Sequence, residues 1–266
     1  MRKLIAAAAG LSALLSLPMA ATAADLPAAA PPPVKAPVYE PPFSWTGFYL
    51  GGNLGGAWAS NNWTLTDPAF TTGFVSPGDD NFIGGGQLGF NYQIGNFVWG
   101  VEGEAEYFAN NNGNAALTSL APVTANGVTA ADTLQVVSNH TWMATVAARF
   151  GFALDRTLYY AKAGWGWVGN NGLTFTDQTS GGAVSLNSFN RNGWLVGAGV
   201  EFAFAYNWTV KLEYSYLNLG SQTFTVPATA PIVAGDTFTT TNASIQSVKL
   251  GVNYLFNWGG PVVARY

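Results

Sequence analysis

Three glutamates at alternate positions, Glu102, Glu104 and Glu106, are the residues of this sequence whose spacing most suggests chemistry. Alternate side chains of an extended strand point to one face, so the three carboxylates would form a row along that face. Hard cations such as Ca²⁺ favour carboxylate oxygens, which makes a metal site one interpretation. The row spreads the carboxylates along the strand, however, and four basic residues occupy comparable positions elsewhere. We therefore expect the glutamates to pair with bases in a structural core.

Other candidate sites are weaker. Lipid-acting enzymes of membranes pair a histidine with a serine. The single histidine of this sequence is His140, and the residues that follow it are Thr141, Trp142 and Met143, none of which is a serine. Asp79-Asp80-Asn81 could bind calcium weakly, although a solvated loop tip is the better explanation. The absence of cysteine from the sequence excludes disulfides and thiolate chemistry. The Gly-x-Gly patterns follow no strand-to-helix switch, so no dinucleotide site is predicted. We expect neither an enzyme nor a cofactor.

The composition indicates what must position these residues. Only 9% of residues are charged, against about a quarter in water-soluble domains. After the first twenty residues no segment stays apolar for the ~18 residues that a membrane helix needs. A chain that is apolar overall but never for long is typical of a membrane-spanning β-barrel. The formal charge of −4 also argues against nucleic-acid binding through a basic face.

The first 43 residues are predicted to be a leader and a tether. Residues 1–23 read as a signal peptide, with Arg2-Lys3, an apolar run to Leu17, and a small-x-small site ending at Ala23. Cleavage after Ala24 fits equally well. Residues 24–43 hold seven prolines, which favour an extended segment that cannot join a sheet. We interpret it as a periplasmic spacer, with contact to peptidoglycan or another partner as the alternative.

Residues 44–266 are predicted to form the barrel, because apolar residues recur there with a period of two. Eight segments reach the ~9–11 residues that a tilted transmembrane strand needs. They are Trp45–Trp58, Ile83–Ile94, Phe97–Phe108, Thr141–Leu154, Thr157–Val168, Gly193–Phe204, Trp208–Leu219 and Ser244–Phe256. The prediction is an all-β fold, an eight-stranded antiparallel up-and-down barrel with both ends of the chain in the periplasm.

The links between these segments alternate in length. Short turns are predicted at Gly95-Asn96, Asp155-Arg156 and Ala205-Tyr206-Asn207. The other four links are long and polar: Ala59–Phe82, Ala109–His140, Gly169–Asn192 and Gly220–Ala243. Bacterial barrels have short periplasmic turns and longer extracellular loops. The long links are therefore predicted to lie outside the cell.

The charged strand residues are predicted to face the barrel interior, because a Lys or Arg at the middle of the bilayer costs about 2–4 kcal/mol. This charge network comprises Glu102, Glu104, Glu106, Arg149, Lys162, Glu201, Lys211, Glu213 and Lys249. An eight-stranded barrel is only wide enough for side chains to fill it, so we expect a salt-bridged plug. Aromatic residues near strand ends are predicted to form interfacial girdles: Trp45, Trp58, Tyr92, Trp99, Trp165, Trp208 and Tyr216.

The short turns also predict register. A three-residue turn at 205–207 sets Glu201 opposite Lys211 and suggests that they pair. The turn at 95–96 sets Gln87 opposite Glu104. The turn at 155–156 sets Arg149 beside Lys162, a repulsion that carboxylates of the Glu102–Glu106 row would have to relieve.

Several runs resemble small outer-membrane surface proteins of the RopB-like, porin-family type. These are Trp45–Asn53 (WTGFYLGGN) after the Ala-Asp-Leu-Pro junction, Gly84–Gln93, Leu212-Glu213-Tyr214 and Val248–Tyr254. The resemblance covers the whole chain and implies an eight-stranded outer-membrane barrel without assigned catalytic residues. Such barrels commonly end on an aromatic residue that serves as an assembly signal. Here both Phe256 and the terminal Tyr266 are candidates.

The predicted function is an integral outer-membrane barrel with a structural and surface role, exported by its signal peptide. Its expected partners are membrane lipid, lipopolysaccharide and the barrel-assembly machinery. Two alternatives stay open: a narrow passive porin for small polar solutes, and an adhesin or receptor that acts through the long loops.

Overall fold

The computed structural model describes residues 43–67, 70–75, 79–109, 114–118, 133–177, 182–225 and 237–256. The chain divides into two compact units, Met1–Glu40 and Pro41–Tyr266, and all of these residues belong to the second. The predicted signal peptide, the tail before Phe43 and Tyr266 lie outside the described residues. Within those ranges no helix is long and apolar enough to cross a membrane.

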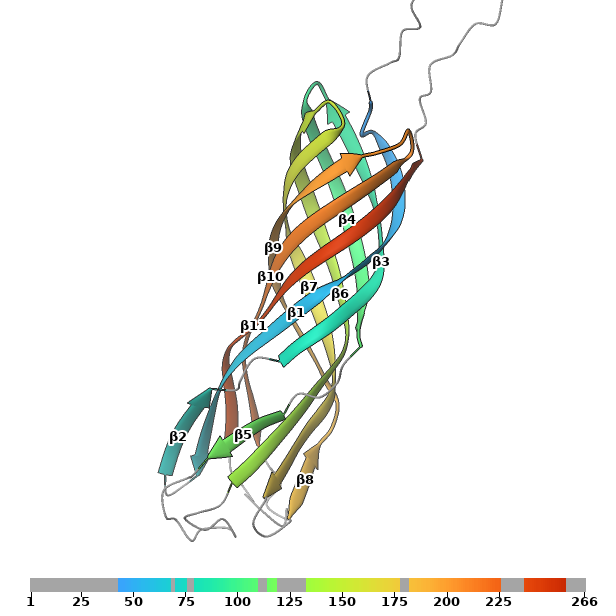
Figure 1. Ribbon diagram of the computed structural model, residues 1–266. Helices are drawn as coiled ribbons and strands as arrows, with labels where there is room; N and C mark the ends of the chain where they lie inside the picture. The colour runs from blue at the N-terminus through green and yellow to red at the C-terminus, as the bar shows by residue number, and fades with distance from the viewer. Residues whose placement is uncertain are drawn as a thin grey trace, which may run out of the picture. The chain divides into compact units, whose positions relative to one another are not determined.

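Eight antiparallel strands close into a ring (Figure 1). Each pairs with its neighbours along the chain, and β1 pairs with β11 to complete the barrel. The ring comprises β1 (Gly47–Asp67), β3 (Asp79–Ile94), β4 (Phe97–Phe108), β6 (Thr133–Leu154), β7 (Thr157–Asp177), β9 (Phe189–Ala203), β10 (Trp208–Thr225) and β11 (Thr237–Phe256). The predicted eight-stranded up-and-down barrel is confirmed.

Tight turns close one end of the barrel, called here the turn end. The first residue of each two-residue turn, Gly95 and Asp155, has a positive φ of 61° and 50°, which suits the right-handed twist of the flanking strands. The third turn begins one residue earlier than predicted, because β9 ends at Ala203. The predicted register is nevertheless present: Lys211 lies opposite Glu201, Gln87 opposite Glu104, and Arg149 opposite Lys162.

The opposite end, the hairpin end, differs from the expected long links. Much of each link continues the barrel strands, and three short strands fold back onto them: β2 (Phe70–Val75) on β1, β5 (Asn114–Thr118) on β6, and β8 (Ala183–Leu186) on β7. Thr, Val and Phe favour strands, and hairpin pairing satisfies backbone groups that a loop would leave to water. The polar, Thr-rich composition of the links therefore did not predict where the strands end.

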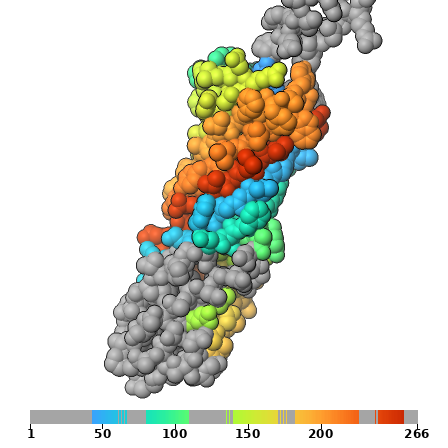
Figure 2. All heavy atoms as spheres, in the orientation of Figure 1, coloured from blue at the N-terminus to red at the C-terminus, as the bar shows by residue number. Residues whose placement is uncertain are grey.

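Side chains alternate between the two faces of the barrel wall, apart from register shifts toward the hairpin end. The lipid-facing side carries large exposed apolar residues such as Leu50, Leu88, Trp99, Val146 and Leu212. Figure 2 shows one face, on which β10, β11, β1 and β3 lie side by side as slanting bands. Lys211 and Glu213 of β10 and Lys249 of β11 point inward, as the period-two pattern predicted.

The interior has an apolar cluster on each side of its charged middle. The turn-end cluster contains Trp45, Val98, Ala153, Leu158, Tyr160 and Ala203, with Phe43 packed against it. The hairpin-end cluster includes Ala57, Ile83, Phe108, Met143, Val168, Leu217 and Ile245. Along β4, β6, β7 and β9 the charged middle falls between members of these two sets, so both apolar clusters cover it.

Candidate functional site

The site is the charged middle of the barrel, called here the charged core. It consists of Glu102, Glu104, Glu106, Arg149, Lys162, Glu201, Lys211, Glu213 and Lys249, each at most 4% exposed. Six strands supply these side chains, and eleven ion pairs of 4.0 Å or less join them. All nine residues expected in the lumen therefore meet in one network.

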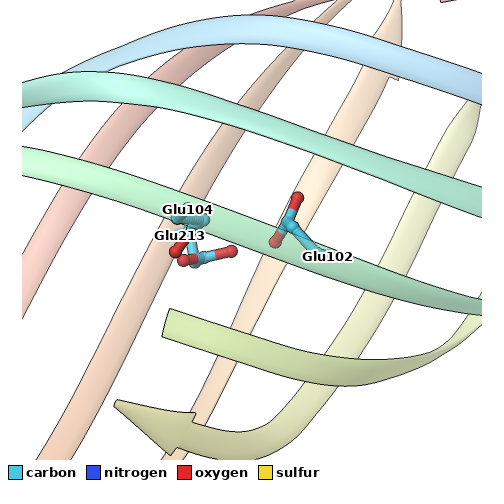
Figure 3. A group of neighbouring side chains, drawn as sticks. All are labelled: Glu102, Glu104 and Glu213. Carbon is cyan, nitrogen blue, oxygen red and sulfur yellow. The ribbon is translucent and has the colours of Figure 1, made fainter. Parts of the chain in front are cut away.

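Three carboxylates form its centre. Glu102 and Glu104 of β4 and Glu213 of β10 project into the barrel interior (Figure 3) and place one oxygen each within 4.8 Å of the others. This spacing would suit a metal ion, but the chain's own bases hold the carboxylates. The Lys162 ammonium lies 3.3, 2.8 and 2.7 Å from Glu102, Glu104 and Glu213. The geometry favours the structural interpretation of the glutamate row.

Lys211 and Lys249 continue the pattern from the neighbouring strands. The Lys211 ammonium lies 3.0 and 2.9 Å from Glu102 and Glu104. The Lys249 ammonium lies 2.6 Å from Glu104 and 2.7 Å from Glu106. Glu104 is thus shared by three lysines, all within 2.9 Å.

Arg149 connects the glutamate row to the turn end. Its Nη1 and Nη2 atoms donate to Glu102 and Glu201 at 3.2 and 2.8 Å. The guanidinium also lies 3.9 Å from the centre of the Tyr160 ring, a cation–π contact. A planar fork with two donor edges suits this bridging position better than an ammonium group would.

Glu201 corrects one predicted pairing. It lies opposite Lys211 in register, but its ion pair within the described residues is with Arg149. Its other oxygen accepts hydrogen bonds from Thr209 and Asn253 at 2.6 and 2.8 Å. The long Lys211 side chain instead reaches across the lumen to β4. Register alone fixes the starting points of the side chains, but not their partners.

Neutral residues complete the charged core, and most of them were not singled out from the sequence. The Tyr49 hydroxyl donates to Glu102, and the Tyr160 hydroxyl donates to Glu213, both at 2.8 Å. Gln87 donates to Asn253 at 2.7 Å. Each of these residues has the inward parity of its strand, and that parity is the sequence signal that could have identified them.

The aromatic residues separate into two groups. Trp58, Tyr92, Trp99, Trp165 and Trp208 are 43–54% exposed on the outer surface, where interfacial rings belong. Tyr216 lies on the same outer face and is partly exposed. Trp45 is the exception, because it is only 1% exposed and packs inside the turn-end cluster, 5.0 Å from the ring of Phe43. Its placement in a girdle was wrong, since the chain enters the barrel mouth before β1 begins at Gly47.

The remaining candidates are not arranged for catalysis or calcium binding. His140 lies within β6, 8% exposed, with its ring 5.7 Å from that of Phe108. Asp79, Asp80 and Asn81 belong to β3 and not to a loop. Neighbouring strand residues point to opposite faces, so the Asp80 and Asn81 side chains cannot converge on one ion. Of the two assembly-signal candidates, Phe256 ends β11 and is exposed on the outer surface, and Tyr266 lies outside the described residues.

Known proteins are similar in sequence to this chain over most of its length. Residues 9–256 match the outer membrane protein beta-barrel domain. The 31 kDa outer-membrane immunogenic protein of Brucella melitensis is 28% identical, over 89% of this chain and 93% of that protein. The 22 kDa outer membrane protein of Rhizobium leguminosarum is 30% identical, over 84% and 82%.

Among solved structures, the outer membrane protein OprG of Pseudomonas aeruginosa is 11% identical, covers 80% of this chain and 98% of its own, and has a TM-score of 0.47. The sequence matches identify the family. This chain is an integral outer-membrane protein that belongs to the outer membrane protein beta-barrel domain family.

Proposed function

We propose that this protein is a closed, non-enzymatic barrel that stabilises the outer membrane and holds its hairpins at the cell surface. The charged core is the observation that carries the proposal. Its nine ionisable side chains are all at most 4% exposed. A water-filled pore would expose at least some of them.

The two apolar clusters support the same conclusion. A polar solute would have to pass the hairpin-end cluster, the charged core and the turn-end cluster in succession. The first and last offer few polar groups to replace the hydration shell of the solute, and each lost hydrogen bond costs on the order of 1–3 kcal/mol. The interior is thus built to hold the wall together, with cross-lumen ion pairs that join strands distant in the chain.

The surface role is supported by the hairpin end. Pairing continues well beyond the apolar surface, with β1 and β11 paired to Thr66 and Thr237. The Brucella relative is named for its immunogenicity, which fits an exposed hairpin end in this chain. Lipopolysaccharide and lipid would contact the outer aromatic surface, and the assembly machinery would bind Phe256 or Tyr266. The proline-rich tail would serve as a periplasmic spacer or contact peptidoglycan.

The absence of enzymatic activity is part of the proposal. His140 is buried against Phe108, and the carboxylates of the charged core bind lysines and an arginine. A hydrolase would need a nucleophile and a base that substrate can reach. The described residues offer no such exposed pair around His140.

A liposome-swelling assay on the refolded mature chain separates this proposal from the porin alternative. We expect swelling with small sugars to match that of protein-free liposomes. Uptake that scales with protein would instead support a narrow porin. The adhesin alternative is tested by deleting residues 114–134, which begin with β5. Loss of attachment to host cells would support it, whereas loss of envelope integrity in a strain without the protein supports the structural role.

A further inference from the structure

Arg191 of β9 is a half-buried cation that does not belong to the charged core. Its side chain shares the inward parity of Gly193 and Leu195. Nη2 donates to the backbone oxygen of Gly220 at 3.1 Å, and Nε is buried without a hydrogen-bond partner. Among the described residues no carboxylate lies within ion-pair distance of it. Partial burial lowers its pKa to about 10.

His140 places a second potential cation nearby. It lies on β6 opposite Asn170 of β7, and Arg191 lies on the next strand opposite Val168. Burial and the Arg191 charge lower the pKa of His140 to about 4. Neither residue has a described acid facing it from β4, β7, β9 or β10. On β4 the ring of Phe108 covers His140, and the next inward residue, Glu106, binds Lys249.

The position of the pair is outside the membrane-spanning part of the strands. His140 is two residues beyond Trp142, and Arg191 is three residues beyond Trp194, and both tryptophans are exposed on the lipid-facing surface. The hairpin-end cluster separates the pair from the charged core. The strand pairing is irregular close to both residues: β6 shifts register near His140, and β10 shifts register near Gly220, which binds Arg191. Irregular pairing of this kind redirects side chains at barrel rims.

We propose that Arg191 and His140 form a binding site for a phosphate or sulfate group at the hairpin end of the barrel interior. A guanidinium has five donors, and the Gly220 carbonyl takes one of them. The remaining donors suit the oxygens of a tetrahedral oxyanion. A protonated His140 ring would add a donor and a second charge. The bound anion supplies the countercharge that the described part of the chain does not provide.

The single histidine of the sequence provides a direct readout. Inorganic phosphate is titrated into the refolded mature chain in detergent micelles, and the His140 ring is followed by ¹H–¹⁵N NMR. We expect a saturable shift with a dissociation constant on the order of 1 mM. Phosphate should also raise the pH at which the His140 ring is half protonated, because a nearby anion favours the imidazolium form.

Variants separate the site from general salt effects. Arg191→Gln should weaken phosphate binding about tenfold. Arg191→Lys keeps the charge and should weaken binding less, and it serves as the test variant if Arg191→Gln does not fold. Arg156→Gln, in an exposed turn at the other end, should bind like the wild type. A chloride titration that reproduces the shift, an unchanged response in Arg191→Gln, or a carboxylate of this chain found on Arg191 would overturn the proposal.

The source of the oxyanion is resolved by a second arm. The titration is repeated in micelles that contain lipid A, whose phosphates are headgroups. Competition with inorganic phosphate would assign the site to lipopolysaccharide, and its absence would assign it to a soluble phosphate or sulfate group. A wild-type protein that shows no saturable shift with either probe, up to about 100 mM phosphate, has no such site.

Discussion

Arg149 and Lys162 lie directly opposite each other on β6 and β7, and both side chains point into the barrel. Like charges in this arrangement repel. Glu102 relieves the repulsion, because its two oxygens lie 3.2 Å from Arg149 and 3.3 Å from Lys162. The closed barrel therefore depends on a carboxylate of β4 that binds bases of the next two strands of the ring, β6 and β7.

Glu104→Gln should destabilise the barrel far more than Glu106→Gln. The first change leaves three buried lysines short of charge, and removing one partner of a buried ion pair costs about 3–5 kcal/mol. Glu106 binds only Lys249, and its Oε2 has no partner among the described residues. Urea unfolding in lipid vesicles measures the free energy of unfolding of both variants. Equal losses in the two variants would contradict this account.

Arg149→Lys should be destabilising although the charge is kept. Lysine replaces the two separate donor groups, Nη1 toward Glu102 and Nη2 toward Glu201, with a single ammonium, and it loses the stacked position 3.9 Å from the Tyr160 ring. We expect a loss of about 2–3 kcal/mol in the free energy of unfolding, from one charged hydrogen bond and the ring contact. Tyr160→Phe is the control for the ring, since it keeps the ring face and removes only the hydroxyl bond to Glu213. A wild-type stability for Arg149→Lys would show that the fork geometry is unimportant.

Gly199→Ala and Gly86→Ala form a matched pair that tests interior packing. A Cβ at Gly199 would lie 2.6 Å from the Tyr160 hydroxyl and from the Leu212 carbonyl, whereas at lipid-facing Gly86 the nearest atom is 3.5 Å away. Overpacking costs about 1–3 kcal/mol, so Gly199→Ala should unfold at lower urea and Gly86→Ala should not. The fraction of heat-modifiable, folded protein on SDS gels provides an independent check. Equal behaviour of the two variants would mean that the lumen has spare room.

The fold and much of the charged core were predictable from the sequence, for a physical reason. A period of two places Lys162 and Glu213 on the inward face whatever their partners are, and the turns fix register. The partners were less predictable, because long side chains such as Lys211 cross the lumen and leave their cross-strand neighbour Glu201 to Arg149. Trp45 was misplaced because the pattern does not show where a strand enters the membrane.

Trp45→Ala should destabilise the protein more than Trp58→Ala. Trp45 fills the turn-end cluster at 1% exposure, and Trp58 is 43% exposed on the outer surface. Deleting a buried aromatic side chain costs about 3–5 kcal/mol. The measurement is urea unfolding followed by the remaining tryptophan fluorescence. A larger loss for Trp58→Ala would indicate that the girdle, and not the turn-end cluster, secures the barrel.

Stability should fall as the pH drops from about 6.5 to about 4, through His140. Its pKa is lowered to about 4 in the folded state and is close to 6.5 when unfolded. The unfolded chain thus binds more protons in this window, so this contribution is complete above pH 6.5 and lost toward pH 4. The loss is up to about 3 kcal/mol at 1.4 kcal/mol per pKa unit. His140→Gln, compared with wild type in phosphate-free buffer, should remove this part of the pH dependence, and an unchanged profile would contradict it.

The closed interior is tested most directly by single-channel recording of the refolded mature chain in planar bilayers. Wild type should leave the bilayer at the conductance of a protein-free membrane, because the charged core and both apolar clusters block the lumen. Glu104→Gln should stay closed as long as it remains folded, since the apolar clusters are intact. Steady, salt-dependent conductance of the wild-type protein would contradict the closed barrel and identify a narrow pore.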